Sequence, residues 1–146
     1  MKHALTIFAF LLCATFHAAA APTPAQEAAF VTRVEKAFTT KDASALLSVY
    51  CLDRIDPELR DQIEKQLIPK LLTLDYSSVE LIRLPPDIAA PYTARGVTYK
   101  PNLKPLKALV IRFRKAPPPA LDSMTMIIGM KDHSLAFALP APISTP

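Results

Sequence analysis

The feature that most constrains this fold is a change in the spacing of apolar residues near residue 75. Before that point apolar residues recur every three or four positions, as at Phe30, Val34 and Phe38, which is the spacing of one face of an α-helix. After it they alternate with other residues, as at Leu109 and Ile111, which is typical of a β-strand. A chain with helices first and antiparallel strands afterwards is predicted to be an α+β protein, with its N-terminal helices packed on one face of the sheet.

The helical part contains three start signals. Residues 23–26 read TPAQ, the pattern of a capped first turn with proline in its first position. Asp42 is predicted to cap a second helix, and Asp56, which precedes a proline, a third. Pro69 cannot donate a backbone hydrogen bond, so we expect a kink or a break in the third helix near Ile68.

The second half of the chain is predicted to form an antiparallel sheet of three to four strands. The predicted strands are residues 79–84, 106–115, 123–130 and 134–139, with a short one at 96–99 inside a proline-rich connection. Only three residues separate the last two strands, so we expect an antiparallel hairpin there. Residues 21–139 are predicted to be a single domain and residues 140–146 a flexible tail.

Residues 1–20 have the pattern of a secretory signal peptide. A basic start is followed by a short apolar run and then by small residues. The run is shorter than the roughly 20 residues of a membrane-spanning helix. Ala18 and Ala20 fit the two small-residue positions before a cleavage site, so we expect cleavage after Ala20 and a secreted or periplasmic protein without a transmembrane segment. Cys13 raises the alternative of a lipoprotein, but Leu12 before it is not the small residue that lipidation requires.

Residues 30–50, FVTRVEKAFTTKDASALLSVY, resemble the opening of nuclear-transport-factor-2-like domains, the cystatin-like α+β superfamily that includes ketosteroid isomerase. The resemblance covers residues 27–50 and the order of helices before strands. It implies a curved antiparallel sheet that forms a pocket with the helices, which is catalytic in some members and not in others. No position of this chain matches a catalytic motif of the family, so the resemblance assigns no site residue.

The sequence offers few groups that could bind a cofactor. Its only glycines are Gly96 and Gly129, which excludes a glycine-rich phosphate loop. After signal cleavage one histidine remains, His133, and the chain contains neither a Cys-x-x-Cys nor a His-Glu-x-x-His motif. We therefore predict no cofactor and no metal.

An enzyme with a pocket between helices and sheet, an isomerase or a hydrolase, is one alternative to a binding protein. Its general base would be a buried carboxylate with a raised pKa. Asp53, Asp75 and Asp87 are the candidates, and all three lie at the ends of predicted elements. Helix capping and exposure to solvent explain their positions more simply, so no residue is assigned a catalytic role.

Cys51 is the only cysteine of the mature chain, and it lies within SVYCLDRIDPELR at residues 48–60. It cannot form an intramolecular disulfide bond, so it is either a buried thiol or a thiol that links two copies. A reactive thiolate is disfavoured at the end of a helix, because that end carries a partial negative charge. We interpret the whole stretch as a corner between two helices and favour the buried thiol.

Six basic residues fall within sixteen positions of the strand-forming part: Lys100, Lys104, Lys107, Arg112, Arg114 and Lys115. Gathered on one face, they would bind an anionic polymer, an envelope surface or an acidic protein. The alternative, which we favour, is a solvated face whose charges prevent pairing between sheet edges. The net charge of +4 falls to +3 without Lys2, which does not predict specific binding to nucleic acid.

These features together favour a small, non-catalytic, secreted or periplasmic α+β module that binds a small ligand or a protein through its sheet side. The two alternatives are the enzyme and the binder of an anionic surface.

Overall fold

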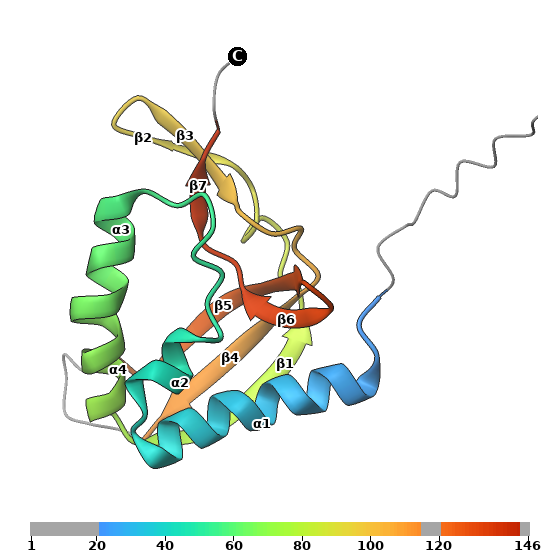
Figure 1. The fold of residues 1–146 in the computed structure, drawn as a ribbon. Helices are drawn as coiled ribbons and strands as arrows, with labels where there is room; N and C mark the ends of the chain where they lie inside the picture. The colour runs from blue at the N-terminus through green and yellow to red at the C-terminus, as the bar shows by residue number, and fades with distance from the viewer. Residues whose placement is uncertain (1–20, 115–120, 144–146) are drawn as a thin grey trace, which may run out of the picture.

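The computed structural model describes residues 21–114 and 121–143, and it shows the predicted α+β fold with antiparallel sheets (Figure 1). The predicted signal peptide, residues 1–20, lies outside the described residues. The same holds for Lys115 and for residues 144–146 of the predicted tail.

The helices begin where their capping residues predict. Helix α1 spans Pro24–Thr40, and its N-cap Thr23 forms a complete capping box with Gln26. Helix α2, Ala43–Leu47, is capped by Asp42, whose carboxylate accepts a hydrogen bond from the backbone of Ala45 at 2.9 Å. Both caps satisfy amides that have no partner inside the helix.

The third helical segment contains a π-helical turn. It consists of α3, Pro57–Gln62, the π turn η1, Ile63–Leu67, and α4, Ile68–Thr73. Of the kink or break that we expect near Ile68, the break does not occur, since the chain remains helical through Pro69, but the π turn that ends at Leu67 is a local irregularity at this point. The Ile68 amide donates to the Ile63 carbonyl, five residues back, and such a local widening lets a helix accommodate a proline that cannot donate a bond of its own.

Asp56 occupies the N-cap position of α3, as predicted, but its side chain forms no capping hydrogen bond. Its carboxylate instead accepts a hydrogen bond from the Tyr99 hydroxyl at 3.2 Å. The prediction of a side-chain cap is therefore wrong, because the carboxylate is turned toward a partner distant in sequence, which bonds to its Oδ2 atom.

The larger sheet has four antiparallel strands in the order β1-β4-β5-β6. Their bounds are Tyr76–Arg83 for β1, Lys107–Phe113 for β4, Ser123–Lys131 for β5 and Ser134–Phe137 for β6. The predicted hairpin between β5 and β6 is confirmed. Its two turn residues, Asp132 and His133, have positive φ angles of 47° and 65°, which suit the tight turn of a hairpin.

Three further strands form a smaller sheet in the order β2-β3-β7. They are β2, Tyr92–Ala94, β3, Val97–Pro101, and β7, Pro140–Pro142. The predicted flexible tail is thus wrong for residues 140–142, which pair with β3, and Ala141 is buried. A position at the end of the chain favours fraying, but pairing with β3 orders these residues, and proline is compatible with a strand at the edge of a sheet.

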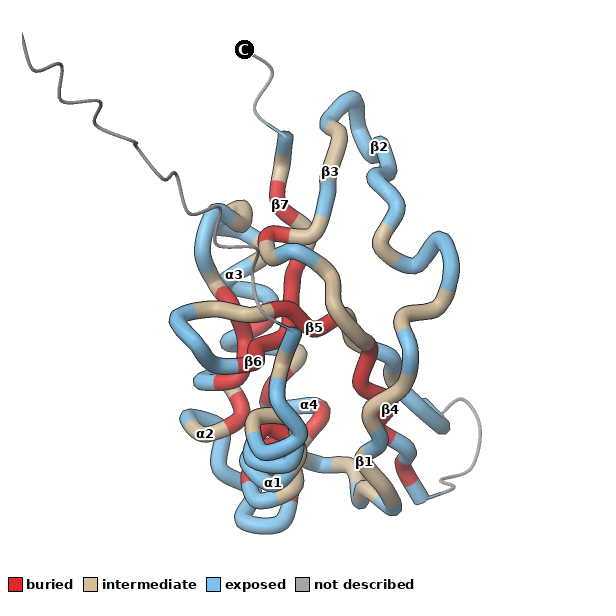
Figure 2. Tube along the Cα trace, turned by 90° about the vertical axis from the view of Figure 1, so that its right-hand side faces the viewer, coloured by how far each residue is buried: buried red, intermediate tan, exposed pale blue. Residues whose placement is uncertain are grey.

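The core lies between the helices and one face of the larger sheet, as predicted. Helix α1 runs across this face, and Phe30 packs against Phe137 of β6 with ring centroids 5.3 Å apart. Leu109 and Ile111 of β4 are fully buried beneath the helices. Figure 2 shows the buried residues concentrated in this middle layer, whereas the smaller sheet, at the end of the molecule opposite α1, is largely exposed.

Besides the Tyr99–Asp56 hydrogen bond, contacts of Asn102 and Gly129 attach the smaller sheet to the rest of the molecule. The buried Asn102 follows β3, and its side chain donates to the carbonyls of Cys51 and Asp53 at 2.7 and 2.8 Å and accepts from the Leu139 amide at 2.9 Å. Gly129 of β5 lies against the same segment. A Cβ atom on Gly129 would stand 2.6 Å from the carbonyl oxygen of Lys104, closer than such atoms can approach.

Candidate functional site

Of the two states that the sequence allows for Cys51, a buried thiol or a thiol that links two copies, the structure shows the buried thiol. Its side chain is fully buried, and its amide donates to the Phe137 carbonyl at 2.9 Å. The stretch around it is the predicted corner between helices, held by Asn102. Because the folded protein covers the thiol, Cys51 is not placed to link two copies.

The predicted basic residues do not share one face. Lys107 lies on the helix side of β4 and forms an ion pair with Glu27 of α1. Arg112 is five residues further along the same strand and therefore points to the opposite side. Arg114 lines a hollow next to Lys41 and Asp75, while Lys100 belongs to the smaller sheet. Sequence spacing could not reveal this separation, because it depends on which face each strand presents.

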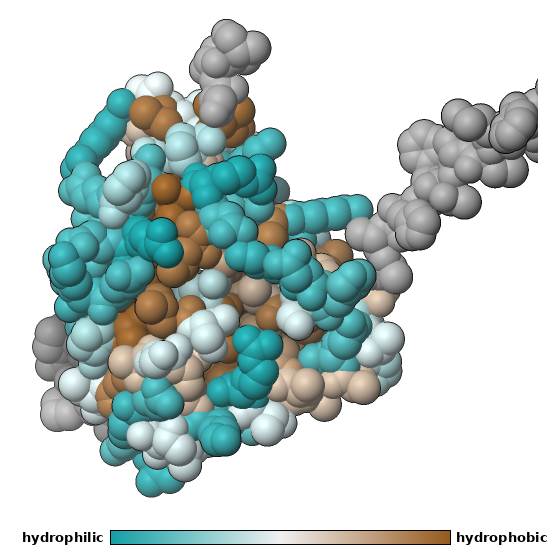
Figure 3. Space-filling model, in the orientation of Figure 1, coloured by the Kyte–Doolittle hydropathy of each residue, from teal (hydrophilic) through white to brown (hydrophobic). Residues whose placement is uncertain are grey.

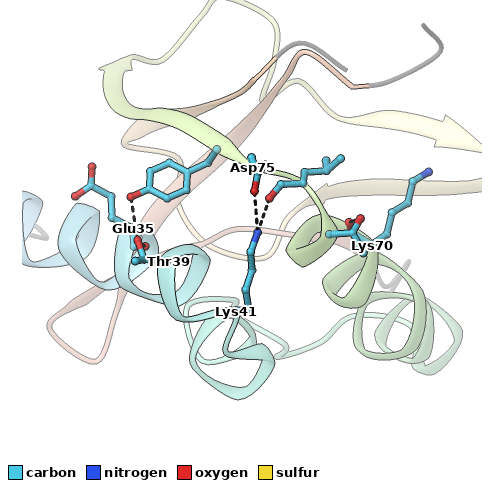
Figure 4. Close-up of polar contacts among 8 residues, drawn as sticks. Glu35, Thr39, Lys41, Lys70 and Asp75 are labelled. Carbon is cyan, nitrogen blue, oxygen red and sulfur yellow. Dashed lines mark hydrogen bonds and ion pairs between the residues drawn. The ribbon is translucent and has the colours of Figure 1, made fainter. Parts of the chain in front are cut away.

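The hollow next to Arg114 contains a solvated polar cluster (Figure 4). Lys41 donates from Nζ to the Leu74 carbonyl at 2.9 Å and lies 3.5 Å from the Asp75 carboxylate. The side chain of Asp75 is 77% exposed, so it does not have the environment of a buried base. These contacts connect the end of α1 to the residues directly before β1, so we assign Lys41 and Asp75 a structural role.

The other carboxylate candidates are equally unsuited to be a general base. Asp53 is exposed, and its hydrogen bond and ion pair with Lys131, 2.7 Å away, lower its pKa. A base that works at neutral pH needs a shift in the opposite direction. Asp87 lies exposed in a loop. Within residues 21–114 and 121–143, no three His, Cys, Asp or Glu side chains are grouped so that they could hold a metal ion.

Tyr50 is the one buried ionisable group whose hydroxyl has no hydrogen-bond partner among the described residues. Burial raises the pKa of this hydroxyl. Its ring packs on Phe137 with centroids 5.0 Å apart, so the side chain belongs to the core. The residue also borders a surface hollow near Lys131 and Asp132, where charges of both signs lie together.

The pocket that the family resemblance implies would lie between the helices and the sheet. In this structure that space is occupied by fully buried side chains, among them Phe30, Phe38 and Leu109. An apolar cavity lies instead on the opposite side of the larger sheet, between Ile127 of β5 and the smaller sheet.

Exposed apolar side chains gather at the smaller sheet. The described part of the chain has five large apolar residues that are clearly exposed, and four of them lie in this sheet or next to it. They are Ile88, Tyr92, Val97 and Ile143, with 37%, 51%, 38% and 37% of their surface exposed, and we call them the small-sheet surface. Tyr92 and Val97 point to one face of the smaller sheet, whereas Ile143, whose amide pairs with Thr98, points to the other, so these residues surround one end of the molecule. Figure 3 shows apolar atoms over the β2–β3 hairpin and the end of β7.

A cavity of about 100 Å³ adjoins the small-sheet surface. Ile88 and Tyr92 line it from one side and Ile127 of β5 from the other, so it lies between the two sheets. Lys100 is the only charged residue of its lining, and it forms no ion pair within the described residues. The arrangement can hold an apolar group next to a negative charge.

The small-sheet surface is held in a defined shape. Tyr92 stacks on Tyr99 with ring centroids 5.5 Å apart and an angle of 22° between the rings. The Tyr99 hydroxyl donates to Asp56, and burial together with this carboxylate raises the Tyr99 pKa. Sequence reasoning missed the site because β2 and β7 are short and bordered by prolines. The Arg95-Gly96 turn between two Thr- and Tyr-containing segments was the signal that could have revealed the hairpin.

Comparisons with known proteins assign no relative to this chain: no protein-family model, no curated protein and no solved structure matches it. Among the described residues, no helix is both long enough and apolar enough to span a membrane.

Proposed function

We propose that this protein is a non-catalytic module that binds another protein through the small-sheet surface, and that it acts outside the cytoplasm after removal of residues 1–20. The observation that supports this proposal is the concentration of Ile88, Tyr92, Val97 and Ile143 at one end of the molecule, next to an apolar cavity. Apolar side chains grouped on a surface are typical of interaction sites, whereas scattered ones are not.

The distribution of ionisable groups favours binding over catalysis. The cavity lining contains a single charged residue, Lys100, and no carboxylate. General acid–base catalysis most often uses a histidine or a carboxylate within hydrogen-bond reach of the substrate, and this lining contains neither. The proposal keeps membership of the nuclear-transport-factor-2-like superfamily as a structural hypothesis, of the kind in which the fold binds without catalysis.

The test is a selection of peptides that bind the protein without residues 1–20. Phage-displayed random peptides are selected on the wild-type protein, and the peptides obtained are measured by fluorescence anisotropy against variants. The double variant Ile88→Ser/Tyr92→Ser should weaken binding about tenfold or more, since buried aromatic and aliphatic anchors carry most of the energy of such contacts. Leu121→Ser is the matched control. Leu121 is the fifth exposed apolar residue, 46% exposed, and it precedes the other end of β5.

The proposal predicts that Leu121→Ser binds the peptides as the wild type does. Equal binding by all three proteins would contradict it, and so would a selection that yields no peptide. Thermal unfolding of each variant shows whether a loss of binding comes from a loss of fold.

A further inference from the structure

We infer that the partner contributes an acidic segment, with one of its apolar side chains in the cavity and a neighbouring carboxylate against Lys100. This inference rests on the proposed function and names the chemistry of the partner.

Charge is the first observation that carries the inference. Residues 92–104 form β2, β3 and the segment after them, and they contain Arg95, Lys100 and Lys104 but no acidic residue. All three side chains are exposed, and none of them forms an ion pair within the described residues. Other basic residues have such partners, for example Lys107 with Glu27. Asp87 precedes Ile88 in the chain and Asp56 bonds to Tyr99, and neither carboxylate forms an ion pair with these three basic residues. The positive charge of Arg95, Lys100 and Lys104 is thus available to a negatively charged partner.

The cavity supplies the second observation. An apolar cavity of about 150 Å³ holds a benzene molecule, so one of about 100 Å³ suits an aliphatic side chain such as leucine. Ile88, Ile127 and Leu139 give it an apolar lining, and Lys100 adds a positive charge beside them. An apolar side chain followed by a carboxylate satisfies both parts of this lining.

The two edges of the smaller sheet differ. On β7 the residues Pro140 and Pro142 have no amide hydrogen to donate, which makes that edge a poor template for another strand. Strand β2 lies at the other edge, and all of its residues are exposed. The β2 side also holds the cavity residue Tyr92 and the neighbouring turn residue Arg95. We therefore expect an extended acidic segment to bind along the β2 edge and not along the β7 edge.

The test uses three synthetic peptides in which leucine alternates with aspartate, with serine or with lysine. We expect the aspartate peptide to bind the wild-type protein about tenfold more tightly than the serine peptide and the lysine peptide to bind least, because Arg95 and Lys100 face it. The variant Arg95→Glu/Lys100→Glu should reverse this order. Arg112→Glu is the matched control, since Arg112 is an exposed basic residue of β4 outside the smaller sheet. It should keep the wild-type order, and added salt should reduce the advantage of the aspartate peptide.

The outcomes separate this inference from the proposed function. If the serine peptide binds as tightly as the aspartate peptide and both need Ile88 and Tyr92, the proposed function stands and the acidic partner is wrong. If no peptide depends on Ile88 and Tyr92, both are wrong. Tighter binding to phosphatidylglycerol vesicles than to the aspartate peptide would overturn the inference in favour of a lipid surface.

Discussion

The two sheets of this protein differ in what covers them. The larger sheet has one face beneath the helices, where Leu109, Ile111 and Phe137 are fully buried. The strands of the smaller sheet contain a single buried residue, Ala141, and contacts of Asn102 and Gly129 help to attach this sheet to the rest of the molecule. The difference suggests a division of roles, in which the larger sheet provides stability and the smaller one provides a surface for binding. Binding surfaces are commonly found in the parts of a fold that contribute least to its stability.

The largest expected effect on stability comes from the core of the larger sheet. Phe137 is fully buried and contacts the rings of both Phe30 and Tyr50. Phe137→Ala should lower the free energy of unfolding by about 3–5 kcal/mol, through lost burial and the cavity that remains. Urea unfolding followed by circular dichroism measures this change. The matched control is Tyr92→Ala in the smaller sheet, and equal losses for the two variants would remove the proposed division of roles.

Asn102 should be the most sensitive residue of the junction. In Asn102→Ala the buried carbonyl of Cys51 and the buried amide of Leu139 lose their side-chain partner, at about 1–3 kcal/mol each, whereas the part-buried carbonyl of Asp53 can bond to water instead. We expect a loss of about 2–3 kcal/mol in urea unfolding, smaller than that of Phe137→Ala. A change below about 0.5 kcal/mol, the range of ordinary surface substitutions, would show that the junction does not depend on this residue.

Gly129→Ala tests the contact between the sheets. The added methyl group would meet the Lys104 carbonyl, so the segment after β3 must move, at a cost of about 1–3 kcal/mol. Gly96→Ala is the matched control. It meets no atom within 4 Å, and its cost of about 1 kcal/mol or slightly more comes only from the positive φ of 77°. Hydrogen exchange should accelerate in β3 and β7 for Gly129→Ala, whereas unchanged exchange in both strands would contradict the contact.

The smallest effect at neutral pH is expected for Tyr50→Phe. The Tyr50 hydroxyl is buried without a partner, so removing it should leave stability unchanged or raise it by up to about 1 kcal/mol. The difference should grow in alkali. The unfolded chain releases the tyrosine proton near pH 10, whereas burial raises the pKa of Tyr50 in the folded protein, so the wild type loses stability as the pH rises above about 10. Identical unfolding of the two proteins at pH 7 and pH 11 would contradict this account.

The sequence predicted the parts of the fold that local signals specify. The caps at Thr23 and Asp42 and the hairpin before Ser134 follow from residues close together in the chain, and all three were correct. Pairings between distant segments were missed. β7 is a strand only because β3 lies beside it, and the Asp56 carboxylate bonds to Tyr99, 43 residues away, rather than to its own helix.

The candidate site was less predictable than the fold for the same reason. The run of basic residues suggested one charged face, but the two faces of β4 separate Lys107 from Arg112. Of the members of that group that the structure describes, only Lys100 and Lys104 lie in the smaller sheet or shortly after it. Ile88, Tyr92 and Ile143 come from three segments that only the fold brings to one end of the molecule. The Arg95-Gly96 turn could therefore have revealed the β2–β3 hairpin but not the whole small-sheet surface.

The most direct test of the central claim is an NMR titration of the aspartate peptide into the ¹⁵N-labelled protein. Binding at the small-sheet surface should change the amide shifts of residues 88–104 and 138–143, while those of β4 and β6 stay constant. Shift changes centred on the helices or on the polar cluster of Lys41 and Asp75, with the smaller sheet unaffected, would contradict the assignment of binding to the small-sheet surface.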